Sequence, residues 1–337
     1  MRPLQLGWAE GVCVVIGDKI ITFDSRSNLN SRGTGFISHA HGDHLHNLSG
    51  DGSTYTTPQT LDMARSLMKV GKRRFFTHEI GHRVKLDEVE VTIHNAGHML
   101  GSAQFCIHTP TQTVAYTGDI NCRDMFTTNA AEKVECDLLV LETTYGNPFY
   151  VFPDLAQTSA EMVEWTVREI RHGRTPVFRV YSSGKPQEII RIFNIFTNIP
   201  VVTDGRIAAT TNVYIKNRIP LCYLSCETRE GKKALDSGEA VFITSSEVPA
   251  EEKRNISVAT ATGWALNGRQ NFRSHSFPLS SHADFRQLVQ YVEEIKPKEV
   301  LTLHGFKEDF ASYIQRKLNV TARPLPPIEQ RILREYL

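Results

Sequence analysis

The stretch 38–44 concentrates side chains that bind metal ions. It reads Ser-His-Ala-His-Gly-Asp-His, so three imidazoles and a carboxylate stand close together in the chain. Imidazole and carboxylate are ligands that zinc and similar divalent metals prefer. In an extended segment His39 and His41 share one face, whereas Asp43 and His44, past a flexible glycine, can turn toward a neighbouring position. This arrangement predicts two metal ions side by side; a solvent-exposed histidine-rich loop is the alternative.

Further acidic and histidine side chains share one place in the pattern, because each lies at or just past the end of a predicted strand. They are Asp24, His98, Asp119, Glu142, His282 and His304. A lone histidine is more often structural, but the repeated placement argues against coincidence. Strands lying side by side in one sheet would bring these ends to a single edge. Asp24 either supports a metal-binding side chain from behind or forms an ordinary turn or helix cap.

The strand predictions rest on short runs of apolar and β-branched residues. The runs 12–16 and 20–24 flank Gly17-Asp18 and predict a β-hairpin. Further strands are predicted at 89–93, 103–107, 113–117, 137–141 and 299–305, and helices at 60–68 and 284–295. Between about 150 and about 270, strands and helices alternate, which predicts an inserted α/β unit.

Within that insert, a small-residue segment precedes a predicted helix. A strand at 175–181 is followed by Ser182-Ser183-Gly184-Lys185-Pro186, where proline at the first helical position is a good start signal. The free N–H groups of such a helix start could hold a phosphate, with Lys185 adding charge, so Ser183, Gly184 and Lys185 are candidate substrate contacts. The alternative is an ordinary strand-to-helix connection. The glycine spacing of a Walker loop is missing.

The bulk properties describe an ordinary globular protein. The chain has 337 residues, 40% hydrophobic and 22% charged, which is enough for one large or two medium domains. Its formal net charge is +1, so a nucleic-acid partner would need local basic patches. Neither a signal peptide nor a membrane span is predicted, and six scattered cysteines are typical of reduced thiols. We therefore expect a cytoplasmic protein with no membrane partner.

The strand-end residues together resemble the signature of metallo-β-lactamase-fold hydrolases, and more narrowly that of the β-CASP nuclease family. The dimetal part is His39-x-His41-x-Asp43-His44 with His98 and Asp119, and the β-CASP part is Glu142, His282 and His304. The segments 260–264 and 280–284 are similar to those of ligase-associated DNA exonucleases. His304 is similar to a histidine of RNA-processing members such as RNase J and the polyadenylation-factor endonuclease. The resemblance covers almost the whole chain.

The resemblance implies a fold and a ligand set. The α/β fold would be a metallo-β-lactamase αββα sandwich formed by residues 1–150 and 271–337, with an inserted α/β β-CASP domain at 151–270. Two Zn²⁺ ions, or Mn²⁺ in their place, would be the cofactors. The first zinc would bind His39, His41, His98 and a bridging Asp119, and the second would bind Asp43, His44, Asp119 and His304. Glu142 would orient His282, the acid on the leaving oxygen, and Asp43 would join these two in catalysis.

We therefore expect a zinc-dependent phosphodiesterase or nuclease that acts on single-stranded or end-containing DNA or RNA through a hydroxide activated by two metals. The alternative is a metallo-β-lactamase-fold hydrolase of small esters or lactones, because fold does not fix function. A non-catalytic subunit is a third possibility, which the full ligand set disfavours. The sequence leaves open DNA versus RNA, exonuclease versus endonuclease, and whether the partner is a second copy or a nucleic-acid processing complex.

Overall fold

The computed structural model of the chain describes residues 4–17, 19–25, 34–45, 53–70, 74–247, 255–267 and 275–328. The chain forms two compact units. Unit 1 comprises Met1–Arg123, Ala130–Phe149 and His282–Leu337, and unit 2 comprises Asp124–Asn129 and Tyr150–Ser281. Within the described ranges, no helix is both long and apolar enough to cross a membrane.

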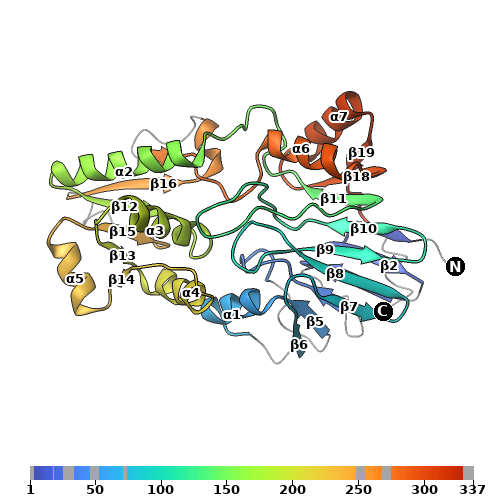
Figure 1. Cartoon of the computed structure of the whole chain (residues 1–337), viewed down its shortest axis with the longest axis horizontal. Coiled ribbons are helices and arrows are strands. Elements are labelled where there is room, and N and C mark those ends of the chain that lie inside the picture. Colours follow the sequence, from blue (N-terminus) through green and yellow to red (C-terminus); the bar gives the residue numbers. More distant parts are fainter. Residues whose placement is uncertain are drawn as a thin grey trace. The chain divides into compact units, whose positions relative to one another are not determined.

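Unit 1 is built on two sheets in the described part of the chain (Figure 1). The first sheet has the strand order β1 (Gln5–Trp8), β2 (Val12–Ile16), β3 (Lys19–Phe23), β4 (Thr34–Phe36), β5 (Ser53–Thr56) and β6 (Arg74–Thr77). The second has the order β19 (Thr321–Pro324), β18 (Glu299–Leu303), β11 (Leu138–Glu142), β10 (Thr113–Tyr116), β9 (Ala103–His108), β8 (Val89–Asn95) and β7 (Arg83–Leu86). The expected hairpin is confirmed: β2 and β3 pair antiparallel, with Ile16 opposite Lys19.

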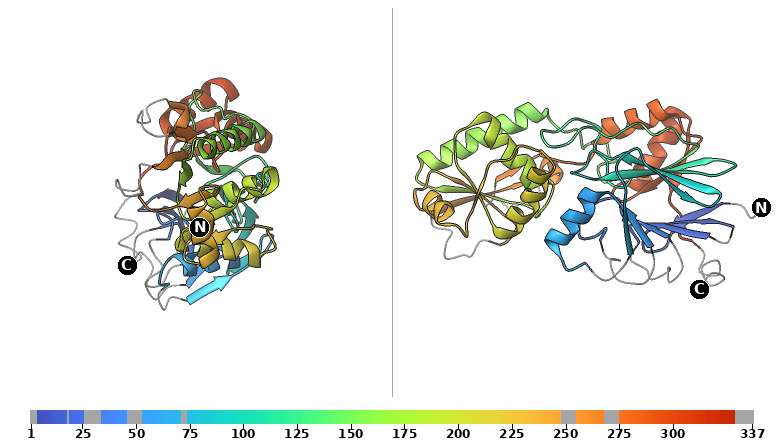
Figure 2. Two further views of the ribbon diagram at one scale, coloured as in Figure 1. Left: turned by 90° about the vertical axis from the view of Figure 1, so that its left-hand side faces the viewer. Right: turned by 60° about the horizontal axis from the view of Figure 1, so that its bottom comes forward.

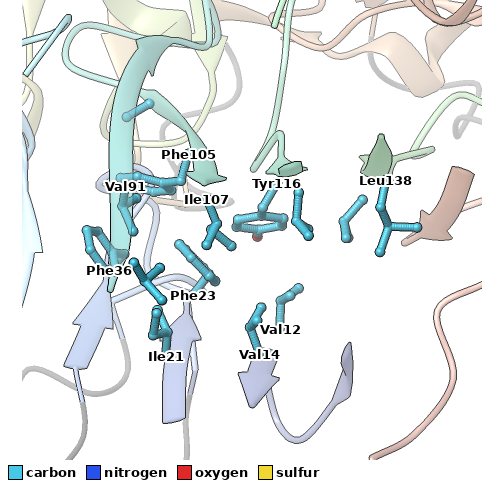
Figure 3. Close-up of a cluster of buried hydrophobic side chains, with 14 of the residues drawn as sticks. Val12, Val14, Ile21, Phe23, Phe36, Val91, Phe105, Ile107, Tyr116 and Leu138 are labelled. Carbon is cyan, nitrogen blue, oxygen red and sulfur yellow. The ribbon is translucent and has the colours of Figure 1, made fainter. Parts of the chain in front are cut away.

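The hydrophobic core of unit 1 contains residues from both of these sheets. Figure 3 shows Val12, Val14 and Ile21 of the first sheet facing Ile107 and Tyr116 of the second. Side chains that alternate along a strand point to opposite faces, so one face of each sheet supplies this core. Burial of this apolar area is the main favourable term that holds the two sheets together.

Helices α6 (Phe285–Ile295) and α7 (Lys307–Leu318) lie beside β18 and β11 (Figure 1). Their apolar residues form a second core cluster with side chains of the second sheet, among them Leu139, Leu141 and Val300. Helix α6 begins where the sequence predicts, because Asp284 and Gln287 form a reciprocal capping box. Helix α1 (Pro58–Leu67) begins earlier than predicted, because Thr57 accepts a hydrogen bond from the N–H of Thr60 and caps it.

Unit 2 is a parallel α/β unit, as the alternating pattern predicts. Its described strands have the order β14 (Leu224–Ser225), β13 (Val201–Thr203), β15 (Val241–Thr244), β12 (Thr175–Arg179), β16 (Ile256–Ala261) and β17 (His275–Phe277). All their pairings are parallel. The accompanying helices are α2 (Leu155–Arg171), α3 (Lys185–Phe196), α4 (Gly205–Lys216), α5 (Arg229–Asp236) and the 3₁₀ helix η2 (Gly263–Asn267). Figure 2 shows helices on both faces of this sheet.

The limits of unit 2 differ from the expected insert of 151–270. Strand β17 pairs with β16, so the chain stays within unit 2 until Ser281. The segment Asp124–Asn129 also belongs to unit 2, because the backbone N–H groups of Phe126 and Thr127 donate to the buried carboxylate of Glu188 on α3.

Candidate metal centre

The predicted site residues of unit 1 come together, but from two sheets rather than one. Asp24 follows β3 and the stretch 38–45 follows β4, both in the first sheet. His98, Asp119, Glu142 and His304 stand at the ends of β8, β10, β11 and β18 of the second sheet. The expectation of a single sheet is therefore wrong. A sequence shows where strands end, but not that two sheets will present their ends at a common edge.

Three imidazoles and one carboxylate form the tightest group of possible ligands. His39, His41, His98 and Asp119 each offer one atom, and these atoms all lie within 4.8 Å of one another. Nε2 of His39 is 3.4 Å from Oδ2 of Asp119, and Nε2 of His98 is 3.7 Å from the same oxygen. Burial and the neighbouring imidazoles lower the pKa of His39 well below its ordinary value, so the ring is neutral and able to bind a metal. The donor set fits a borderline divalent metal.

Asp24 lies behind this group and is almost fully buried. Its Oδ2 accepts hydrogen bonds from Oγ of Ser38 at 2.6 Å and from Oη of Tyr116 at 2.8 Å, and lies 2.9 Å from Nδ1 of His44. Its Oδ1 accepts from the backbone N–H of Ser38 at 2.7 Å. Oγ of Ser38 is also 2.9 Å from Nδ1 of His39. Asp24 thus orients the ring of His44 directly and that of His39 through Ser38, and the Nε2 atoms of both rings face Asp119. A carboxylate behind a metal ligand has the same role.

His44 connects this network to Asp43 and His304. Nε2 of His44 is 3.8 Å from Oδ2 of Asp119 and 3.7 Å from Oδ2 of the largely exposed Asp43. Burial by itself lowers the pKa of His44, but the carboxylates of Asp24 and Asp119 outweigh it and raise that pKa to about 10. The ring of His304 lies 6.3 Å from that of His44, centroid to centroid. Asp43, His44 and His304 are therefore neighbours, but more loosely gathered than the first group.

The buried Glu142 and the partly exposed His282 form a pair next to Asp119. Nδ1 of His282 lies 2.9 Å from Oε1 of Glu142, and Nε2 lies 3.9 Å from Oδ2 of Asp119. The other Glu142 oxygen accepts the N–H of Thr144 at 2.9 Å. Burial by itself raises the pKa of Glu142, but the charge of His282 and these hydrogen bonds hold it below its usual value. Glu142 is therefore an anionic acceptor that orients the imidazole of His282.

A tight turn places His304 at the edge of the second sheet. His304 has φ of 61°, which few residues other than glycine adopt, and Gly305 follows with φ of 48°. A Cβ at Gly305 would lie 2.4 Å from Cα of Thr144, so only glycine fits. Oγ1 of Thr143 donates to the carbonyl of His304 at 2.8 Å and holds the turn in place. Backbone strain of this kind is concentrated at functional sites.

The candidate phosphate contacts lie in unit 2, at the start of α3. Gly184 is the residue before the helix, with φ of 80° and no side-chain cap. Nζ of Lys185 is 5.9 Å from the centroid of the exposed Tyr181 ring, and burial lowers the pKa of Lys185 to about 8. The helix start predicted from Pro186 is confirmed. The role of Ser183, Gly184 and Lys185 in substrate binding remains a prediction.

Sequence analysis missed Ser38 and Tyr116, which connect the site to Asp24. Ser38 adjoins the histidine run, and Tyr116 ends an apolar strand on its inward face. A buried tyrosine hydroxyl needs a partner, so an inward-facing tyrosine at a strand end was a usable signal.

Comparisons with known proteins agree with this centre. The family described as "Zn-dependent metallo-hydrolase RNA specificity domain" matches residues 270–323. A probable DNA ligase of Opitutus terrae is 31% identical over 298 residues, which cover 84% of this chain and 28% of that protein. The transcription termination factor FttA of Pyrococcus horikoshii is 25% identical, covering 85% and 59%. An RNase J-like protein of Methanocaldococcus jannaschii is 26% identical, covering 67% and 66%. The chain thus spans from about a quarter to about two thirds of the length of these relatives.

A solved structure supports the fold as a whole. A protein of unknown function from Enterococcus faecalis superposes with a TM-score of 0.65 at 16% identity, covering 95% of this chain and 97% of that one. The metallo-hydrolase match and the grouped histidines and aspartate agree that the cofactor is a metal ion. The sheets, the parallel α/β insert, the donor set and the relatives identify the chain as a member of the β-CASP family within the metallo-β-lactamase superfamily.

Proposed function

We propose that this protein is a zinc-dependent nuclease that hydrolyses phosphodiester bonds of single-stranded or end-containing DNA or RNA. The observation that carries the proposal is the Glu142–His282 pair: a partly exposed imidazole, oriented by a buried carboxylate, stands 3.9 Å from Asp119, outside the His39, His41 and His98 group. A hydrolase of small esters with an activated leaving group has no need of such a second proton donor, whereas the leaving alkoxide of a phosphodiester does.

Two zinc ions would be held by the two sets of donors. His39, His41, His98 and Asp119 would hold the first, in keeping with their mutual separation of at most 4.8 Å. Asp43, His44, Asp119 and His304 would hold the second, and manganese would be accepted in place of zinc. When bound, such a pair supplies Lewis acidity that lowers the pKa of an attacking water and neutralises charge on phosphoryl oxygens.

The protein side chains supply orientation and a proton. Glu142 binds Nδ1 of His282, and Nε2 of that ring faces Oδ2 of Asp119 at 3.9 Å. From there His282 delivers a proton to the leaving oxygen, a contribution typically worth about 10²–10⁴-fold in rate. Asp24 and Ser38 keep His39 and His44 in the ring orientations that metal binding needs.

The substrate class rests on the relatives. One is named RNase J-like, one a probable DNA ligase and one a transcription termination factor, and the matched family model is described as an RNA specificity domain. We assign unit 1 to the metallo-β-lactamase domain and unit 2 to the β-CASP domain, which would contact the strand through Ser183, Gly184 and Lys185. A homodimer or a nucleic-acid processing complex would be compatible with this role.

The test is an activity assay on the metal-loaded chain, with end-labelled single-stranded DNA and RNA and a lactone as control substrate. His282→Ala should keep its metal, measured by elemental analysis, and lose about 10²-fold or more of strand cleavage. His39→Ala should lose both metal and activity. His82→Ala, an exposed histidine outside the centre, is the matched control and should retain both. Loss of metal in His282→Ala would make that residue a ligand, and lactone hydrolysis without strand cleavage would refute the proposed function.

A further inference from the structure

An exposed tryptophan stands beside the metal centre. Trp8, the last residue of β1, is 38% exposed. Its ring centroid lies 5.9 Å from that of His304, and the two rings are nearly perpendicular at 87°. His304 in turn neighbours His44 at 6.3 Å. The indole thus lies next to His304, which is itself one of the candidate metal-binding residues.

The fold determines that this indole lies at the edge of the core. Along β1, Leu4, Leu6 and Trp8 share one face, because side chains alternate along a strand. Leu4 and Leu6 pack against the core between the two sheets, and Trp8 continues that row beyond the core. Strand β1 runs antiparallel to β2, which runs antiparallel to β3, so the end of β1 lies at the same edge as the end of β3 and Asp24.

Backbone contacts on both sides hold Trp8 in place. On one side Trp8 pairs with Val12 of β2. On the other side the backbone N–H of Trp8 donates to the carbonyl of Pro326 at 2.7 Å. The N–H of Ile328 donates to the carbonyl of Trp8 at 3.0 Å. Gly7 permits this close approach, since a Cβ there would lie 2.9 Å from the carbonyl oxygen of Pro326. These bonds involve only the main chain, so the indole can be replaced without removing them.

We propose that Trp8 is a nucleobase-binding residue, on which a base of the nucleotide beside the scissile phosphate stacks. This inference rests on the proposed function and specifies how its substrate is recognised. Every base has a π-face, so an aromatic platform is tolerant of sequence, and base stacking on one is worth about 1–3 kcal/mol by alanine substitution. A pre-positioned indole loses little conformational freedom when a base stacks on it.

The first experiment compares Trp8→Ala and Trp8→Phe on the metal-loaded protein. For a normal single strand, kcat/KM should fall between about 5-fold and about 150-fold in Trp8→Ala, and much less in Trp8→Phe, which keeps a stacking face. The same strand with an abasic nucleotide at the cleavage position should be cut equally by Trp8→Ala and the unchanged protein. Zinc content should not change.

The outcomes separate this inference from the proposed function. Equal loss on the normal strand and on the abasic strand would mean that Trp8 only supports His304, and would overturn the inference. Strand cleavage that is unaffected in Trp8→Ala would overturn it as well, while leaving the nuclease function intact. Absence of cleavage by the unchanged, metal-loaded protein would refute the nuclease function.

A binding measurement tests the inference independently of cleavage. A single-stranded oligonucleotide should quench the tryptophan fluorescence of the metal-loaded chain. In Trp8→Phe a share of this quenching should be lost. The control is Trp264→Phe, which replaces a similarly exposed tryptophan of unit 2 and should retain that share. Quenching identical to that of the unchanged protein in Trp8→Phe would overturn the inference, whatever the catalytic result.

Discussion

The exchange Asp24→Asn tests whether the carboxylate behind the imidazoles sets metal affinity. Asparagine has the same shape and removes only the charge and one acceptor oxygen. The backbone should tolerate it, because Asp24 has φ of 49°, a conformation that asparagine adopts as readily as aspartate. An alanine at this position would add backbone strain and confuse the result. Any loss in Asp24→Asn therefore reports on the hydrogen bonds of the carboxylate.

The magnitude follows from the four contacts that Asp24 makes. If the new amide nitrogen replaces Oδ1, it faces the backbone N–H of Ser38. Two hydrogen-bond donors then lie 2.7 Å apart with no acceptor between them. If it replaces Oδ2, the hydroxyls of Ser38 and Tyr116 can rotate to accept, but Nδ1 of His44 must then give up its proton. Either way a buried, charge-assisted bond is lost, so we expect destabilisation by about 2–4 kcal/mol. Loss of an orienting partner should weaken zinc binding by about 10–100-fold.

The control is Tyr116→Phe, which deletes one of the four hydrogen bonds and leaves the imidazole contacts in place. It should cost about 1–2 kcal/mol and leave zinc affinity nearly unchanged. Stability is measured by urea unfolding of the metal-free protein, and zinc affinity by competition with a chromophoric chelator. The affinities are compared over a pH series, because Asp24 also raises the pKa of His44 and a proton on that ring competes with metal. Equal zinc affinity in Asp24→Asn and the unchanged protein would refute the orienting role.

Three further predictions concern pH, the second unit and metal removal. Hydrogen bonds from Lys298 and Thr113 lower the pKa of Asp137 to about 2, so its pKa in the folded state lies below that in the unfolded state. The ionised carboxylate therefore stabilises the fold above about pH 4, and this contribution is lost as the pH falls through about 2. Because its side chain is partly exposed, we expect Asp137→Asn to cost about 1 kcal/mol at pH 7 and only a small fraction of that near pH 2 in urea unfolding. Glu188→Gln should leave a buried N–H of Phe126 or Thr127 unpaired and speed hydrogen exchange across 124–129, whereas the exposed Glu161→Gln should not. Chelation of metal should lower the melting temperature of the unchanged protein more than that of His39→Ala, since bound metal stabilises only the folded site.

Much of the centre was predictable because its residues are chemically conspicuous. Imidazoles and carboxylates at strand ends have few structural roles, so His39, His98 and Asp119 stand out from an apolar background. The α/β alternation likewise predicted unit 2. Helix starts were less predictable: α1 begins at Pro58 because Thr57 accepts a hydrogen bond from the N–H of Thr60, although the sequence pattern predicts a start at Thr60.

The partition of the donors between sheets could not be predicted from local patterns. Pairing of β3 with β4, and of β11 with β18, joins residues far apart in the chain, and no local signal specifies it. The limits of unit 2 have the same origin, because β17 belongs to the third sheet only through its pairing with β16. The buried support of the site was missed for a different reason. Ser38 and Tyr116 carry ordinary hydroxyls, and their importance comes from a partner, Asp24, that only the fold supplies.

Three of the site residues take their positions from the core, because each directly follows a buried apolar residue. Phe23 precedes Asp24, Leu141 precedes Glu142 and Leu303 precedes His304, and all three apolar side chains lie in the core clusters of unit 1. A well-packed interior resists displacement, so each of these three residues is held in place by its buried neighbour. Tyr116 connects the core to the metal centre, because its ring packs in the core and its hydroxyl donates a hydrogen bond to Asp24. The packing of two sheets against each other is therefore what makes one metal centre out of residues from both.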